Sequence, residues 1–262
     1  PSALGLNHLL YDDFPWIHSR VEEYVHNAAP FLAWHSYFLH IYEATLKEEC
    51  SFAGSIPCLL PTQSLFSFFS TRTNGDRKRG FGSDGDSSIS RRPILDGYCV
   101  RDGPLQNFEI SYLDKRYYPH RLSRGFLAGE DLRNQSESLS PERMEELLRL
   151  DHYDSFNLGL ENGPHLAIPR SVRGDFSLLT APSDPVFFLH HGQLDRVWWR
   201  WQAERSTRRM EYAGISSHGS ERLARISDEL DMGGLAPGIA VSEVLDSIWI
   251  AMLHLLKHCH LS

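Results

Sequence analysis

The sequence predicts a mainly α-helical fold with long, loop-rich connections. Apolar residues recur at helical spacing in several segments, and these segments begin at capping residues or at a proline. Convincing alternating strands are few, and the chain has no internal repeat beyond two histidine-bearing helical regions. The 262 residues, of which 41% are hydrophobic and 23% charged, suffice for one large domain or two small ones.

Two helices are expected near the N-terminus. The first covers residues 12–29, where Asp12 or Asp13 can cap it and a proline suits its first turn. Pro30 should interrupt this helix, since proline lacks the N–H that a helix interior needs. A second helix then covers roughly Ala33–Cys50 and carries an apolar stripe that would face the core.

The later part of the chain alternates loops with shorter helices. Residues 57–125 look loop-rich, and the polar stretch Gly80–Arg92 within them has almost no core-forming side chains. A Ser-Pro pair then opens a helix over residues 141–150, with the serine as its cap. Two more helices are expected over residues 184–204 and 220–230.

Charge and cysteine content argue against several classes of protein. The net charge of −8 argues against a nucleic-acid binder, which usually carries a basic face. No apolar run reaches about 18 residues, so neither a transmembrane span nor a membrane partner is expected. The four cysteines are too few for a disulfide scaffold and lack zinc-ribbon spacing. We expect small buried side chains, with a Cys50–Cys99 disulfide as the alternative in an oxidising compartment.

Histidine is the anomaly of the composition. The chain has 14 histidines, and they gather near its start, in its middle and at its end. Near the start, His18 and His26 are eight residues apart and can share one side of a helix, and His35 follows on a helix that can fold back. Three neutral imidazoles on two helices would suit copper, zinc or iron, with ordinary helix histidines as the alternative.

The middle of the chain adds the adjacent pair His190 and His191. On a helix these residues point about 100° apart, so only one should face a given metal while the other packs or hydrogen-bonds beside it. Phe187 lies one turn before His191 and can pack against its ring, and three following tryptophans would keep a metal site dry. The terminal cluster between His254 and His260 is interpreted as an amphipathic tail with incidental histidines.

Several stretches of the sequence resemble one known family. The second copper signature of tyrosinases and catechol oxidases resembles DPVFFLHHGQLDRVWWRWQ (184–202), and the first resembles HNAAPFLAWHSYFLHIYEATL (26–46). The segment that gives the first copper site its first histidine resembles YDDFPWIH (11–18). The similarity, above all to short fungal tyrosinases, implies a tyrosinase-like copper-binding domain over residues 1–246 and a divergent C-terminal tail over 247–262.

The resemblance implies a helical bundle that holds a binuclear (type-3) site of two copper ions. It implies these ligands: His18, His26 and His35 for the first copper, and His165 and His191 for the second. His190 matches a neighbouring histidine that is not a ligand, and Phe187 matches a phenylalanine that packs beside the site. No further catalytic side chain is implied. The reaction would use O2 to oxidise a phenolic small molecule, an o-diphenol, to a quinone, with monophenols or aminophenols as further candidates.

One ligand that the resemblance requires is missing. The pattern H-x-x-x-H at the second copper runs here from His165 to Pro169, and proline offers no donor to a metal and should end or kink a helix. Three interpretations remain open. His152 or His120 completes the site, two histidines and water hold the second copper, or the chain binds one copper or none. Leu166 stands where monophenol-active relatives often carry asparagine, which favours diphenols.

Two segments depart further from the resemblance. Residues 58–79 and 247–262 replace stretches that are typical of the family, and both look like translated intron or a shifted reading frame. Two alternatives therefore stand beside a copper oxidase of phenols: a non-catalytic binder of copper or oxygen, and a degenerate, non-catalytic homologue. A zinc hydrolase is not expected, because the H-E-x-x-H pattern is absent.

Overall fold

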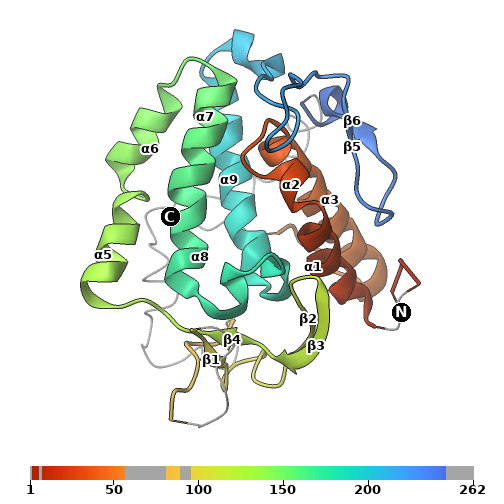
Figure 1. The fold of residues 1–262 in the computed structure, drawn as a ribbon, viewed down its shortest axis with the longest axis vertical. Helices are drawn as coiled ribbons and strands as arrows, with labels where there is room; N and C mark the ends of the chain where they lie inside the picture. The colour runs from red at the N-terminus through yellow and green to blue at the C-terminus, as the bar shows by residue number, and fades with distance from the viewer. Residues whose placement is uncertain (1, 6–7, 57–80, 89–95, 246–262) are drawn as a thin grey trace. The chain divides into compact units, whose positions relative to one another are not determined.

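The computed structural model describes residues 2–5, 8–56, 81–88 and 96–245. Its architecture is mainly helical, which confirms the predicted fold class (Figure 1). The chain divides into two compact units, each assembled from three segments. The first unit contains Pro1–Arg20, Leu60–Ser140 and Leu166–Phe187, and the second contains Val21–Leu59, Pro141–His165 and Phe188–Ser262. None of the helices in the described ranges is long and apolar enough to cross a bilayer.

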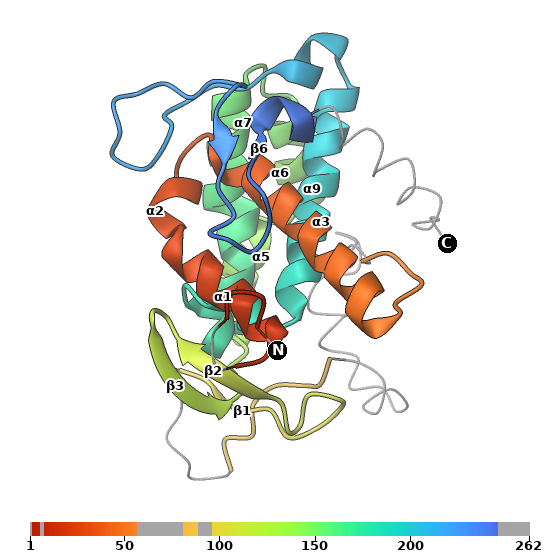
Figure 2. The same cartoon turned by 90° about the vertical axis from the view of Figure 1, so that its right-hand side faces the viewer.

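The second unit is built on helices. Its helices are α2 (Glu22–Val25), α3 (Pro30–Cys50), α6 (Pro141–Leu148), α7 (Tyr153–Leu160) and all but the start of α9 (Val186–Ala203). A π turn (Glu161–His165) extends α7, a 3-10 turn (Ser206–Met210) follows α9, and β5 (Glu229–Leu230) pairs with β6 (Ile239–Ala240). Figures 1 and 2 both show α3 and α7 beside α9, which makes α9 the helix on which this unit is assembled.

Aromatic contacts join α9 to both of these neighbours. The ring of Phe188 stacks on Tyr42 of α3 with 3.4 Å between ring centroids. Further along α9, the ring of Trp201 stacks on Phe156 of α7 at 4.8 Å, and its indole N–H donates to the Leu150 carbonyl at 2.7 Å. Such pairs contribute about 0.5–1.5 kcal/mol beyond the burial of their apolar area. The position of α9 is thus fixed from two sides.

The break between the first helices differs from the prediction. The helix expected over residues 12–29 is two helices, because α1 (Leu10–Arg20) stops at Arg20 and α2 stops at Val25. His26 is extended and Asn27 has φ of 52°, a left-handed conformation that no α-helix contains. Pro30 begins α3 instead of merely interrupting a helix, since its fixed φ suits a first helical position.

The first unit combines α1 with short strands and turns. Its strands form two antiparallel pairs, β1 (Tyr98–Cys99) with β4 (Ser123–Arg124) and β2 (Glu109–Leu113) with β3 (Arg116–Arg121). Its other elements are α5 (Gly129–Glu137), α8 (Leu166–Val172) and two 3-10 turns, Gly174–Ser177 and Ala181–Ser183. The segment expected to be loop-rich therefore contains a β-hairpin, and α5, α7 and α8 were not anticipated.

Two further expectations were wrong. Residues 220–230 do not form a helix, because Leu223 and Ile226 are 68% and 40% exposed and give the segment no apolar face to bury. Cys50 is exposed and Cys99 is half-buried, so neither is the small buried side chain that was expected, and both are free thiols, which also excludes the alternative of a disulfide between them. The terminal histidine cluster, the tail over 247–262 and the segment over 58–79 lie outside the described residues.

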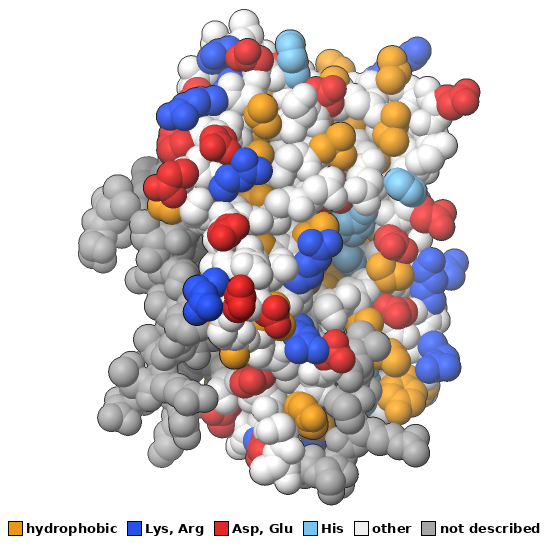
Figure 3. All heavy atoms as spheres, turned by 60° about the vertical axis from the view of Figure 1, so that its left-hand side comes forward, with side chains coloured by type: hydrophobic (Ala, Val, Ile, Leu, Met, Phe, Trp, Pro, Cys, Tyr) orange, Lys and Arg blue, Asp and Glu red, His pale blue; other side chains and the backbone are white. Residues whose placement is uncertain are grey.

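Exposed charges of both signs lie close together on the surface. On the face drawn in Figure 3, blue and red side chains are interspersed, not gathered by sign. Two exposed ion pairs of α6 are typical, Arg143 with Glu146 and Glu145 with Arg200. Pairs of this kind contribute about 0–1 kcal/mol, because water screens the charges and the long side chains lose freedom.

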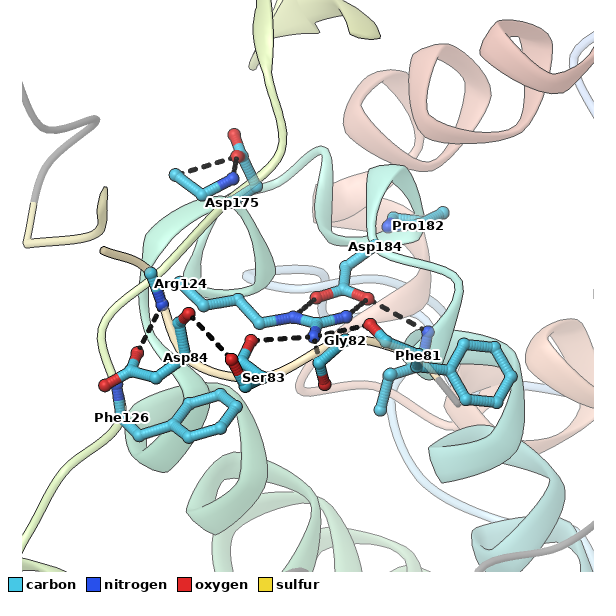
Figure 4. A network of polar contacts seen from close by, with 12 residues as sticks. Phe81, Gly82, Ser83, Asp84, Arg124, Phe126, Asp175, Pro182 and Asp184 are labelled. Carbon is cyan, nitrogen blue, oxygen red and sulfur yellow. Dashed lines mark hydrogen bonds and ion pairs between the residues drawn. The ribbon is translucent and has the colours of Figure 1, made fainter. Parts of the chain in front are cut away.

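A buried ion pair of the first unit is different in kind (Figure 4). Arg124 is completely buried and makes two parallel bonds to Asp184, from Nε at 2.7 Å and from Nη2 at 2.8 Å. The remaining Nη1 donates to the carbonyls of Phe81 at 2.8 Å and Ser83 at 3.3 Å. Asp184 also accepts the backbone N–H of Val186 at 3.1 Å. Since Val186 is the first residue of α9, this one carboxylate both neutralises Arg124 and fixes where α9 begins.

We predict that Asp184→Ala lowers the free energy of unfolding by about 3–5 kcal/mol, because it leaves the Arg124 charge buried without a partner. Urea denaturation of the full chain measures the loss. The matched control is Glu146→Ala, which breaks an exposed pair and should leave stability nearly unchanged. Equal effects of the two substitutions would contradict a structural role for the buried pair.

Candidate metal centre

Five imidazoles gather in the second unit. They come from four places in the chain: His26 follows α2, His35 lies on α3, His165 ends the π turn, and His190 and His191 are neighbours on α9. All are buried except His26, which keeps partial exposure. Ring-centroid distances link them into one group. His35 stacks on His191 at 4.3 Å, His26 lies 5.2 Å from His35, and His165 lies 5.2 Å from His191.

Three of these side chains form a tighter cluster. One ring nitrogen from each of His165, His190 and His191 lies within 4.8 Å of the other two. The ring of His190 is almost parallel to that of His165, at 5.6 Å and 12°. We expected only one of the two adjacent histidines to face a given metal, but both offer a nitrogen to the same cluster. The angular separation of their Cβ atoms did not predict this, because an imidazole reaches well beyond its Cβ.

Backbone carbonyls orient several of the rings. The Nδ1 of His35 lies 2.7 Å from the carbonyl oxygen of Phe31, and the Nδ1 of His165 lies 3.3 Å from that of Glu161. A carbonyl can only accept, so each Nδ1 carries the proton and the lone pair is on Nε2. In the first unit, His18 has the same arrangement, with Nδ1 2.6 Å from the Leu179 carbonyl. All three rings therefore have the tautomer of an Nε2 metal ligand.

The surroundings of the rings keep them neutral. Burial lowers the pKa of His26 to about 4, against the opposing effect of a hydrogen bond to the Glu22 backbone. Burial likewise lowers the pKa of His190 to about 3, although a hydrogen bond to the His165 backbone opposes it. The neutral imidazole is the form that binds metals, and a set of buried nitrogen donors suits copper or zinc better than magnesium or calcium. The donor set therefore fits copper.

The structure also places the remaining predicted residues. Phe187 belongs to the first unit and packs edge-on against His18 of that unit, with ring centroids 5.2 Å apart. Two of the three tryptophans of α9, Trp198 and Trp201, are fully buried, and both contact Tyr153 of α7. They anchor the helix that carries His190 and His191.

Neither histidine that was considered as a replacement for the missing ligand is available. The side chain of His152 is 78% exposed and lies beside Glu211 at 3.6 Å. In the first unit, both ring nitrogens of His120 are engaged, Nε2 with Asp175 at 2.8 Å and Nδ1 with the Tyr118 carbonyl at 2.6 Å. These contacts argue against the alternative in which one of them completes the second site.

Pro169 does not end the helix that contains it. It lies inside α8, which continues to Val172, and its carbonyl accepts the N–H of Arg173 at 2.8 Å. The π turn Glu161–His165 directly before α8 already shifts the hydrogen-bond ladder, and a proline is tolerated where the ladder is interrupted. Such π turns often mark functional sites.

Sequence reasoning missed one acidic residue of this region. Glu161 is buried, its Oε1 accepts the backbone N–H of Asn27 at 2.8 Å, and its Oε2 has no hydrogen-bond partner in the structure. Burial raises its pKa to about 7, although the bond from Asn27 opposes the shift. The glutamate lies four residues before His165, and that spacing was the signal that could have identified it.

Comparisons with known proteins agree with these features. A family model described as the common central domain of tyrosinase matches residues 8–204. The tyrosinase-like protein phomQ1 of Diaporthe leptostromiformis is 37% identical over 94% of this chain and 68% of its own length. Tyrosinase ustQ of Aspergillus flavus is 35% identical over 94% of this chain and 69% of its own length. A solved structure of a polyphenol oxidase from Thermothelomyces thermophila is 25% identical, with a TM-score of 0.71 over 90% of this chain and 74% of that one.

The buried imidazoles predict a pH dependence for the metal-free protein. An unfolded histidine has a pKa of about 6.5, whereas folded His26 and His190 stay neutral down to about pH 4 and 3. Between these values the unfolded state binds more protons, so the free energy of unfolding falls as the pH drops below about 6.5.

We expect His26→Gln to flatten this dependence by up to about 1.4 kcal/mol per pH unit, because one group with a lowered pKa is removed. Urea denaturation at pH 7, 6 and 5 measures the slope. The parent chain, measured at the same three pH values, is the reference for the slope. An unchanged slope in the His26 variant would contradict the burial of a neutral ring there.

Proposed function

The chain belongs to the tyrosinase family, and we propose that it uses two copper ions and O2 to oxidise o-diphenols to o-quinones. It is an oxidase of the tyrosinase and catechol oxidase type. The observation that carries the proposal is the group of five imidazoles in the second unit, of which His35 and His165 have the tautomer that an Nε2 copper ligand needs.

We assign the ligands from the family motifs together with these orientations. His26 and His35 would hold the first copper with His18, which we include from its motif and from its Nδ1 hydrogen bond. His165 and His191 would hold the second copper. Phe187, packed on the ring of His18, would keep that imidazole in place.

Bound copper would supply the electron transfer between the diphenol and O2. Each diphenol releases two electrons and two protons as it becomes a quinone, so two diphenols reduce one O2 to two waters. The protein must keep the metal-binding nitrogens unprotonated and in place while these protons move, and the carbonyl bonds at Nδ1 of His35 and His165 fix the tautomer with the lone pair on Nε2. The buried Oε2 of Glu161, which makes no hydrogen bond in the structure, is the atom we propose to hold a proton in transit.

The preference for diphenols rests on Leu166. This residue directly follows His165 and begins α8, and its side chain has no hydrogen-bonding group. A monophenol must lose its hydroxyl proton before it can be oxygenated, and Leu166 cannot hold a water that would accept that proton. We therefore propose that o-diphenols are oxidised in preference to monophenols.

We predict that the copper-loaded full chain consumes O2 with 4-tert-butylcatechol and far less with 4-tert-butylphenol, as measured with an oxygen electrode. His35→Ala should lower the rate at least about 100-fold, because even a residue that only supports a metal ligand is typically worth 10–100-fold. The exposed His152→Ala is the control and should keep the parent rate. A chain that binds two coppers yet consumes no O2 would instead be a copper or oxygen binder.

A further inference from the structure

We propose that His190 takes the place of the imidazole that is lost at Pro169, so that His165, His190 and His191 together hold the second copper. This inference rests on the proposed copper function. It differs from the expectation that His190 is a neighbour without a ligand role, because it gives a ligand role to a histidine of the motif that the family's ligand set leaves out.

The first argument is the geometry of the three rings. One nitrogen of His190 lies within 4.8 Å of a nitrogen of His165 and of His191, and the side chain is buried, with 4% of its surface exposed. Metal–nitrogen bonds of about 2 Å place two donors on one ion roughly 3–4 Å apart. A small change of side-chain torsion angles thus suffices for three imidazoles to bind one ion.

The second argument connects His190 to Pro169. The family pattern places a histidine at residue 169, four residues after His165, and the proline that stands there offers no donor to a metal. The ring of His190 lies almost parallel to that of His165, with ring centroids 5.6 Å apart and 12° between the planes. His190 therefore places beside the His165 ring the imidazole that residue 169 does not supply.

The third argument is the lack of another candidate. The described part of the second unit contains three more histidines, and all three are exposed: His40, His152 and His218. His190, by contrast, is buried.

The test is the copper content of the full chain, measured by elemental analysis after anaerobic loading with Cu(I) and removal of excess metal. We expect two coppers per chain for the parent and about one for His190→Ala. In Pro169→His/His190→Ala, residue 169 again supplies an imidazole and the content should return to two. A merely structural role for His190 would not be rescued in this way. His152→Ala is the matched control and should retain two coppers.

Three results would overturn the inference. The first is two coppers in His190→Ala. The second is a loss of copper that Pro169→His does not restore, although the metal-free double variant unfolds at the same temperature as the parent. The third is a single copper in the parent. The first two leave the proposed oxidase intact, because the parent then still binds two coppers and its O2 consumption is measured separately. A parent chain with one copper or none would overturn both the inference and the proposed function, because the proposed oxidation uses two coppers.

Discussion

The constraint on which the rest of the structure depends is that several imidazoles are buried together. Charged rings at such short distances would repel one another and lose their hydration, so each ring must stay neutral. A neutral imidazole still has one N–H to satisfy, and the helices supply the acceptors, as the Phe31 carbonyl does for His35 and the Glu161 carbonyl does for His165. These hydrogen bonds satisfy the buried N–H at Nδ1, and they also direct Nε2 of each ring toward the other imidazoles.

The second requirement is that the rings stay where they are, and this depends on α9. The helix carries His190 and His191, its start is set by the carboxylate of Asp184, and its later turns are stacked on α7 through Trp201. Arg124 in turn holds Asp184 by two short hydrogen bonds. A rotation of α9 would break the cap and the aromatic stacking at once, so the two histidines are presented in one orientation.

Local patterns were enough to predict much of this arrangement. The helices around His35 and around His190 follow from apolar spacing, and the motifs that contain these residues point to copper, because both signals lie within about 20 residues of sequence. Three features depend on contacts between distant residues or on the lack of them: the helix break at His26 and Asn27, the β2–β3 hairpin and the irregular segment 220–230. On a helix, the side chains of His190 and His191 were expected to point in different directions. Because an imidazole ring is long, a nitrogen of each still comes close to a nitrogen of His165.

Pro169 shows that the ligands of a metal are determined by which side chains lie together in the fold, and not only by their spacing in the sequence. By sequence, the proline is a loss, because a side chain that binds metal is replaced by one that does not. In the structure the helix continues past it to Val172, and the ring of His190 lies almost parallel to the ring of His165 at 5.6 Å. An imidazole that is lost at residue 169 can therefore be replaced by one at residue 190, which is distant in sequence. The two positions have to be interpreted together.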